Sequence, residues 1–107
     1  MTVSAASAND LVDLVRLFAG YLRFYQVPRA ESDIADFLGE RLQRGDAQLF
    51  IARDAQGVAQ GFVQLYPLFS SLALEPAWLL SDLYVDEAFR RAGVGEALMN
   101  AARAHAE

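Results

Sequence analysis

A short segment rich in arginine and glycine, Arg90-Arg91-Ala92-Gly93-Val94-Gly95, carries the clearest chemistry in the sequence. It stands at the start of a stretch with helical periodicity, and the first backbone N–H groups of a helix have no intrahelical acceptor. Gly93 and Gly95 have no side chains to keep a ligand away from the backbone, and two arginines add permanent positive charge. We therefore predict an anion site, and phosphate is the anion that such a helix start favours.

Two other phosphate-binding patterns do not fit this segment. A P-loop needs GxxxxGK[ST], and the chain contains no lysine. The dinucleotide fingerprint places GxGxxG directly after a strand, whereas the order here is RxxGxG after a polar turn at 86–90.

Asp82 is the candidate catalytic residue, because it is a carboxylate inside an otherwise apolar strand that leads into the anion site. It would act as a base, or orient a water or a cationic substrate. The alternative is a structural role in satisfying nearby loop backbone. Tyr21 and Tyr25 are candidate substrate residues, since aromatic rings at the end of a helix can hold an amine by cation–π contact. Packing in the core is the alternative for both tyrosines.

The periodicity of apolar residues predicts the elements that position these side chains. Pro67–Pro76 is expected to be a loop, and Ala77–Val85 a central strand covered on both faces. Gly61 is expected to allow a close backbone approach, and Ser7 to Asp10 form a capping box. In chain order the expected elements are a strand at Thr2–Ala6, a helix from Leu11 to near Gln26, a helix from its cap Ser32 to Gly45, strands at Gln48–Arg53, Val58–Tyr66 and Ala77–Val85, and a helix starting in Gly93-Val94-Gly95.

The spacing Val85-x4-Arg90-x2-Gly93-x-Gly95, together with this order of elements, resembles the GNAT superfamily of N-acetyltransferases. The resemblance implies an α/β fold with a mixed, mostly antiparallel sheet flanked by helices, and acetyl-CoA as cofactor. It implies that Arg90 to Gly95 bind the pyrophosphate and that Leu83, Tyr84 and Val85 run beside the pantetheine arm. It also implies a β-bulge in this strand. Ser81 stands where some relatives carry a glutamate, which puts a Glu base in doubt.

The resemblance covers residues 1–107 as a single domain. In the family, further strands and a helix follow the last helix predicted here. We therefore expect the sequence to lack the C-terminal strands of the fold. An uncovered strand edge would favour pairing with a partner, so a homodimer is expected.

Composition excludes several other classes of protein. With no cysteine and a single His105, a disulfide scaffold, a thiolate metal site and a catalytic triad are all disfavoured, and no metal is expected. The net charge of −5 and the scattered arginines do not match a nucleic-acid-binding surface. No apolar run is long enough for a membrane span, and no signal peptide is recognisable, so a cytoplasmic protein is expected.

The sequence thus predicts transfer of an acetyl group from acetyl-CoA to a primary amine of a small cationic molecule or a protein. The alternative is a non-catalytic acyl-CoA-binding or assembly module, which the missing glutamate and C-terminal strands would favour.

Overall fold

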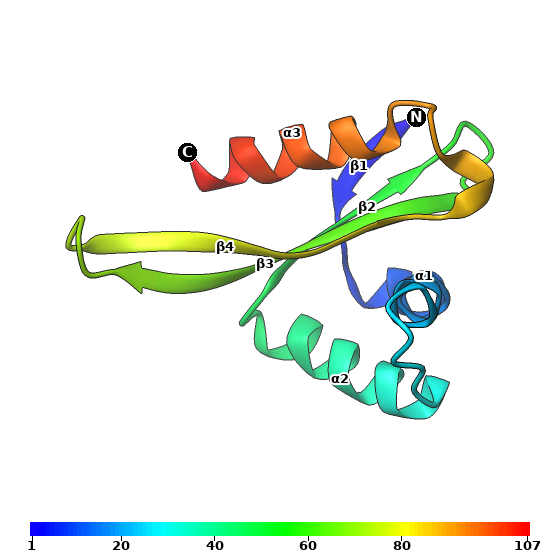
Figure 1. The fold of residues 1–107 in the computed structure, drawn as a ribbon, viewed down its shortest axis with the longest axis horizontal. Helices are drawn as coiled ribbons and strands as arrows, with labels where there is room; N and C mark the ends of the chain where they lie inside the picture. Colours follow the sequence, from blue (N-terminus) through cyan, green and yellow to red (C-terminus); the bar gives the residue numbers. More distant parts are fainter.

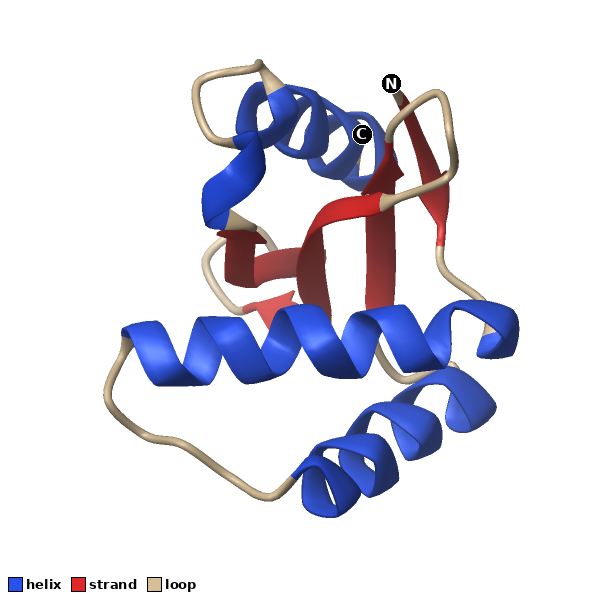
Figure 2. Ribbon diagram, turned by 90° about the vertical axis from the view of Figure 1, so that its right-hand side faces the viewer, coloured by secondary structure: helices blue, strands red, loops and turns tan.

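The computed structural model describes all 107 residues as a four-stranded sheet with helices on both faces (Figures 1 and 2). The strand order is β1-β2-β3-β4, and every neighbouring pair is antiparallel. Short 3-10 turns precede α1 and α3. The elements are β1 (Thr2–Ala5), η1 (Ala8–Asp10), α1 (Leu11–Phe24), α2 (Glu31–Arg44), β2 (Gln48–Arg53), β3 (Ala59–Ser70), β4 (Glu75–Val85), η2 (Glu87–Phe89) and α3 (Val94–Ala106).

Two apolar clusters, one on each face of the sheet, hold the layers together. Leu14 and Leu17 of α1 pack with Phe62 of β3 on the face that α1 and α2 cover. Val63 of β3 packs with Leu98 of α3 on the opposite face. Because side chains alternate along a strand, β3 contributes to both clusters, and its first part, from Ala59 to Leu65, is buried. The predicted α/β architecture is confirmed.

The prediction that Ala77–Val85 is a central strand covered on both faces was wrong. β4 is the last strand in the order, and its outer edge has no neighbour. Its first half is largely exposed, although Trp78 still contacts His105 of α3, and the residues from Asp82 to Val85 are half-buried. The expected alternation of two covered faces belongs to β3.

The predicted loop at Pro67–Pro76 was also wrong, because β3 continues to Ser70 and β4 begins at Glu75. The two strands form a long hairpin that projects from the body of the protein (Figure 1). Pairing between β2 and β3 ends at Leu65, so Pro67 lies where β3 has a single neighbour. Proline has no backbone N–H to donate to a neighbouring strand. It is tolerated here because no second strand needs that donor.

The helix boundaries follow the predicted capping chemistry at most ends. The Ser7 N–H donates to Asp10 Oδ2 at 2.9 Å, as in the expected capping box. Gly45 ends α2 in the left-handed conformation, and Gly93 directly precedes α3. The assignment of Ser32 as a cap was wrong, since α2 begins after Ala30 and Ser32 lies inside its first turn.

Gly61 is the site of the predicted close approach. A Cβ placed there would lie 2.6 Å from the backbone oxygen of Tyr84 and 3.2 Å from Leu98 Cδ1. The absence of a side chain therefore lets β4 and α3 approach β3 directly beside the candidate site. None of the helices is long and apolar enough to cross a membrane.

Candidate active site

The predicted anion site has an unpaired row of backbone donors. The N–H groups of Arg91, Ala92 and Gly93 make no backbone hydrogen bond, and the first helical bond of α3 runs from Ala97 N–H to Gly93 O at 3.0 Å. Arg91 and Gly93 both have positive φ, 67° and 81°. Left-handed residues on either side of Ala92 turn successive backbone N–H groups toward one concave surface, and such a surface can bind a phosphate. A Cβ at Gly93 would meet no atom within 4 Å, so the approach to this surface is open.

The turn before this row is fastened to the rest of the fold through Asp86. Its backbone N–H donates to Gln60 O at 2.8 Å, and its Oδ1 accepts from the Ala88 N–H at 3.1 Å. Arg16 of α1 donates to Asp86 Oδ2 at 3.1 Å. The anion site is thereby held at a fixed position at the end of β4.

The outer edge of β4 continues from the anion site. Since the Asp86 N–H bonds to β3, the alternation of an antiparallel ladder turns the peptide groups of Leu83 and Val85 away from β3. Arg90 Nε donates to Val85 O at 3.1 Å, and its guanidinium lies 5.5 Å from the ring centroid of Phe24. Arg90 therefore lines the edge of β4, while the backbone of the following residues faces the anion site.

The register of β4 shifts at Ser81. Gln64 pairs with Asp82 and Leu65 with Leu80, so Ser81 is an extra residue, as in a β-bulge. A bulge leaves its extra residue out of the ladder and re-aims neighbouring groups. The expected irregularity of this strand is thus present, immediately before the candidate catalytic residue.

Asp82 is held by two neutral hydrogen-bond donors. Tyr21 Oη donates to its Oδ1 at 2.8 Å, and Gln64 Nε2 donates to its Oδ2 at 2.9 Å. Burial and the bond to Asp82 raise the pKa of Tyr21, so its hydroxyl stays a donor at neutral pH. Gln64 is fully buried and was not predicted from the sequence. An amide in a largely apolar strand was the one available sequence signal, and Gln60 in the same strand shares it.

Two pockets meet at the Tyr21–Asp82 hydrogen bond. The edge pocket, of about 310 Å³, brings both predicted substrate residues together with Phe24 and with four of the predicted cofactor residues, while Arg91 to Gly95 lie outside its lining. The lining residues are Tyr21, Phe24, Tyr25, Leu83, Tyr84, Val85 and Arg90. The inner pocket, of about 370 Å³, lies under the sheet and is lined by Phe18, Leu22, Arg29, Asp33, Ile34, Phe37, Tyr66, Ser81 and Asp82. Its lining residues on α2 and on the connection before it were missed in the sequence, because only the packing of α2 against the sheet brings them to Asp82.

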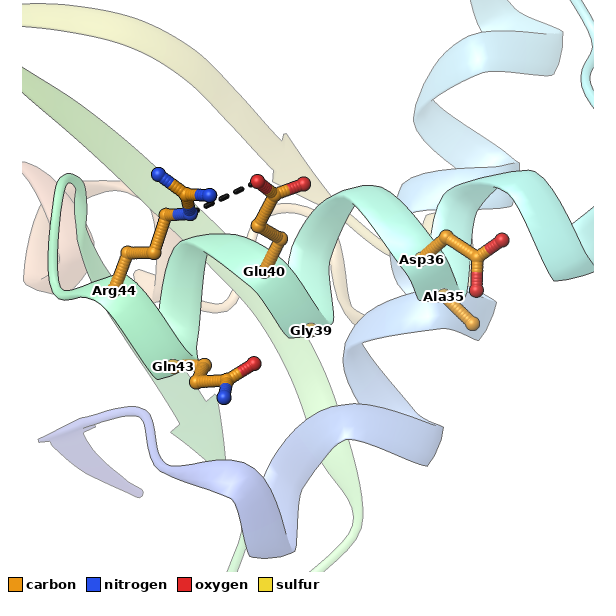
Figure 3. Close-up of a pocket in the computed structure, with 6 residues that line it drawn as sticks. All are labelled: Ala35, Asp36, Gly39, Glu40, Gln43 and Arg44. Carbon is orange, nitrogen blue, oxygen red and sulfur yellow. Dashed lines mark ion pairs between the residues drawn. The ribbon is translucent and has the colours of Figure 1, made fainter.

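The largest hollow lies elsewhere and holds no candidate residue. It is an open depression of about 740 Å³ along α2, and all six lining residues belong to that helix (Figure 3). Glu40 Oε1 and Arg44 Nε form a 2.9 Å ion pair across one end of it (Figure 3). No group of three His, Cys, Asp or Glu side chains lies close enough together to hold a metal ion.

Comparison with known proteins decides the family. Residues 45–107 match the acetyltransferase (GNAT) domain family. The chain belongs to the GNAT acetyltransferase family. It is 33% identical over 106 residues to the uncharacterized N-acetyltransferase YhfO of Bacillus subtilis, covering 99% of this chain and 70% of that protein.

Two further relatives support the same assignment. A probable acetyltransferase of Haemophilus influenzae is 36% identical over 104 residues, covering 96% of this chain and 70% of that protein. The crystal structure of a probable acetyltransferase superposes with a TM-score of 0.93 at 36% identity, covering 99% of this chain and 71% of that one. This GNAT protein is therefore an acyltransferase.

Proposed function

We propose that this GNAT protein transfers an acetyl group from acetyl-CoA to the primary amine of a small cationic molecule, with Asp82 receiving the proton of the amine. The observation that carries the proposal is the Tyr21–Asp82 hydrogen bond, which joins the inner pocket to the edge pocket beside the anion site. A pocket of about 370 Å³ matches the usual size of a small-molecule site.

The unpaired N–H row fits the anionic part of acetyl-CoA. Arg91, Ala92 and Gly93 offer backbone donors, the start of α3 adds the partial positive charge of a helix, and Arg91 adds a full charge. The outward peptide groups of Leu83 and Val85 would hold the amide-bearing arm. When bound, acetyl-CoA supplies the acetyl group as an activated thioester.

The chain's own residues then have three tasks. Asp82 attracts the ammonium form of the substrate and takes up a proton from it, because only the neutral amine is a nucleophile. Tyr21 and Gln64 keep the carboxylate in one orientation throughout. The backbone beside Ser81, which the bulge displaces from the ladder, offers an N–H donor near the place where negative charge develops.

Release of free thiol from acetyl-CoA in the presence of a panel of primary amines tests this proposal. We expect release with at least one amine and its loss in Asp82→Asn. Asp36→Asn is the matched control, because Asp36 belongs to the depression along α2 and not to the inner pocket. No amine-dependent thiol release by the wild-type protein, or equal rates in both variants, would contradict the proposal.

We also propose that the protein is cytoplasmic and that it forms a homodimer through the outer edge of β4. Exposed apolar side chains on the β3–β4 hairpin, including Phe69 at 81% and Leu74 at 89% exposure, add to the unpaired strand edge. A homodimer would cover them. Light scattering on the wild-type protein and on Phe69→Ser distinguishes a dimer from a monomer.

A further inference from the structure

The inner pocket carries an anionic side chain on the sheet wall, and side chains of both signs on the wall formed by α2 and the connection before it. The sheet wall presents Ser81 and Asp82, while the helix wall presents Arg29 and Asp33. Apolar side chains, among them Ile34 and Phe37, line the rest of the pocket. A ligand that satisfies this lining carries charged groups of both signs together with an apolar part.

Arg29 and Asp33 are exposed residues that form no ion pair within the protein. The ion pairs of the chain engage Arg16, Arg41, Arg44 and Arg53, and none includes Arg29 or Asp33. The two side chains line one wall without bonding each other, so the wall offers an acceptor of cations beside a donor to anions. A zwitterionic head group, with an ammonium and a carboxylate on one carbon, satisfies both.

Asp82 differs from Asp33 because it is already fixed in place. Its two neutral donors, Tyr21 and Gln64, orient the carboxylate without neutralising its charge. It can therefore bind a second, separate ammonium at the sheet wall, which is the end that meets the edge pocket.

From this arrangement we propose that the amine substrate is an α,ω-diamino acid. Its carboxylate binds Arg29, its α-ammonium binds Asp33, its methylene chain lies against Ile34 and Phe37, and its ω-amine lies at Asp82. The proposal rests on the proposed function and names the substrate class of that site.

Simpler amines fit the pocket less completely. A plain diamine leaves Arg29 unpaired and places a like charge near it. An ω-amino acid without an α-amine leaves Asp33 unpaired. Unpaired charge in a ligand-filled site disfavours each of these analogues, so the two residues provide specificity as well as affinity.

Four amines of similar length test the two contacts separately. Lysine carries both head groups, cadaverine lacks the carboxylate, 6-aminohexanoate lacks the α-amine, and pentylamine lacks both. We expect kcat/KM for lysine to exceed that for each single-deletion analogue by about tenfold, as for the loss of one charge-assisted contact. Nα-acetyl-lysine, which represents a lysine within a protein, should fall to the level of 6-aminohexanoate. Equal rates for lysine and cadaverine would overturn the proposal.

Variants assign each preference to its residue. In Arg29→Ala the preference for lysine over cadaverine should disappear, and in Asp33→Asn the preference over 6-aminohexanoate should disappear. Arg23→Ala and Asp36→Asn are the matched controls and should keep both preferences, because neither residue lines the inner pocket. Unchanged preferences in Arg29→Ala and Asp33→Asn would contradict the assignment.

Calorimetric titration with lysine, with and without coenzyme A, gives a readout that does not depend on turnover. We expect lysine to bind and each of the two variants to weaken its binding about tenfold. Thiol release with pentylamine but no preference for lysine would reject this inference and keep the proposed function. Absence of thiol release with every amine would reject the proposed function itself, and the inference that rests on it.

Discussion

The hydroxyl of Tyr21 donates to Asp82 Oδ1 at 2.8 Å, which joins the last turns of α1 to β4 just after the shift in its register. Tyr21 lines the edge pocket and Asp82 the inner pocket, so this one bond connects the two pockets of the candidate site. The hydrogen bond from Gln64 completes the fixing of the carboxylate. The account of catalysis depends on this arrangement.

Removal of the carboxylate charge should have a larger effect than removal of its orienting partner. We predict that Asp82→Asn lowers kcat by about 10²- to 10⁴-fold, the usual contribution of a general base. Tyr21→Phe should lower kcat by only about tenfold, since Gln64 still holds the carboxylate. Steady-state kinetics with acetyl-CoA and the best amine would measure both. A Tyr21→Phe variant slower than Asp82→Asn would argue that the hydroxyl, not the carboxylate, acts on the substrate.

Arg91 combines backbone strain with a proposed binding role. Its φ of 67° is unfavourable for a residue with a side chain, and a glycine there relieves about 1 kcal/mol. We predict that Arg91→Gly raises the free energy of unfolding while it weakens binding of acetyl-CoA. Leu74→Gly, at a φ of 57° in the hairpin turn, should stabilise without any change in binding. Denaturant unfolding and calorimetry on the same samples separate the two effects.

Gly61 should be intolerant of even one methyl group. The nearest atom to an added Cβ is the backbone oxygen of Tyr84 at 2.6 Å, which cannot move without shifting β4. We predict that Gly61→Ala destabilises the protein by about 1–3 kcal/mol, the usual cost of overpacking. Urea unfolding checks the value. A stability equal to that of the wild type would show that β4 is not held against β3 at this point.

Acid should weaken the contact between the start of α1 and β2. Burial alone raises the pKa of Asp10, but hydrogen bonds from Arg53 and the Ser7 N–H outweigh it, so the pKa of Asp10 lies below its ordinary value. A carboxyl with a lowered folded-state pKa stabilises the protein above its unfolded value, near about pH 4, and that contribution is lost as the pH falls further. We predict that the temperature of the unfolding midpoint decreases as the pH is lowered below about 4, and that this decrease is smaller in Asp10→Asn. Thermal unfolding at a series of pH values measures it.

Local sequence was sufficient for the elements that local chemistry defines. The positions of Gly45 and Gly93 were predictable because each follows or precedes an amphipathic stretch and takes a positive φ that glycine favours. A bulge in this strand followed from the resemblance and not from propensity, but its place at Ser81 was not predicted. The long hairpin was missed, because Pro67 and the serines at 70 and 71 have the composition of a loop.

The inner pocket could not be predicted from local sequence. Arg29 and Asp33 have the composition of an ordinary loop and helix start. Only the packing of α1 and α2 against the sheet brings them into one pocket with Asp82. Gln64 likewise gains its partner from the pairing of β3 with β4. Such long-range contacts depend on how the layers assemble, which periodicity does not encode.

The central claim is that the segment from Arg90 to Gly95 binds acetyl-CoA. Calorimetric titration with acetyl-CoA tests it most directly, on the wild type, on Gly93→Glu and on the control variant Gly45→Glu. Both glycines have positive φ and open space at Cβ, so the two variants carry the same added charge and similar backbone strain. The account predicts that the wild type and Gly45→Glu bind acetyl-CoA and that Gly93→Glu does not. Equal binding by all three proteins, or no binding by the wild type, would contradict it.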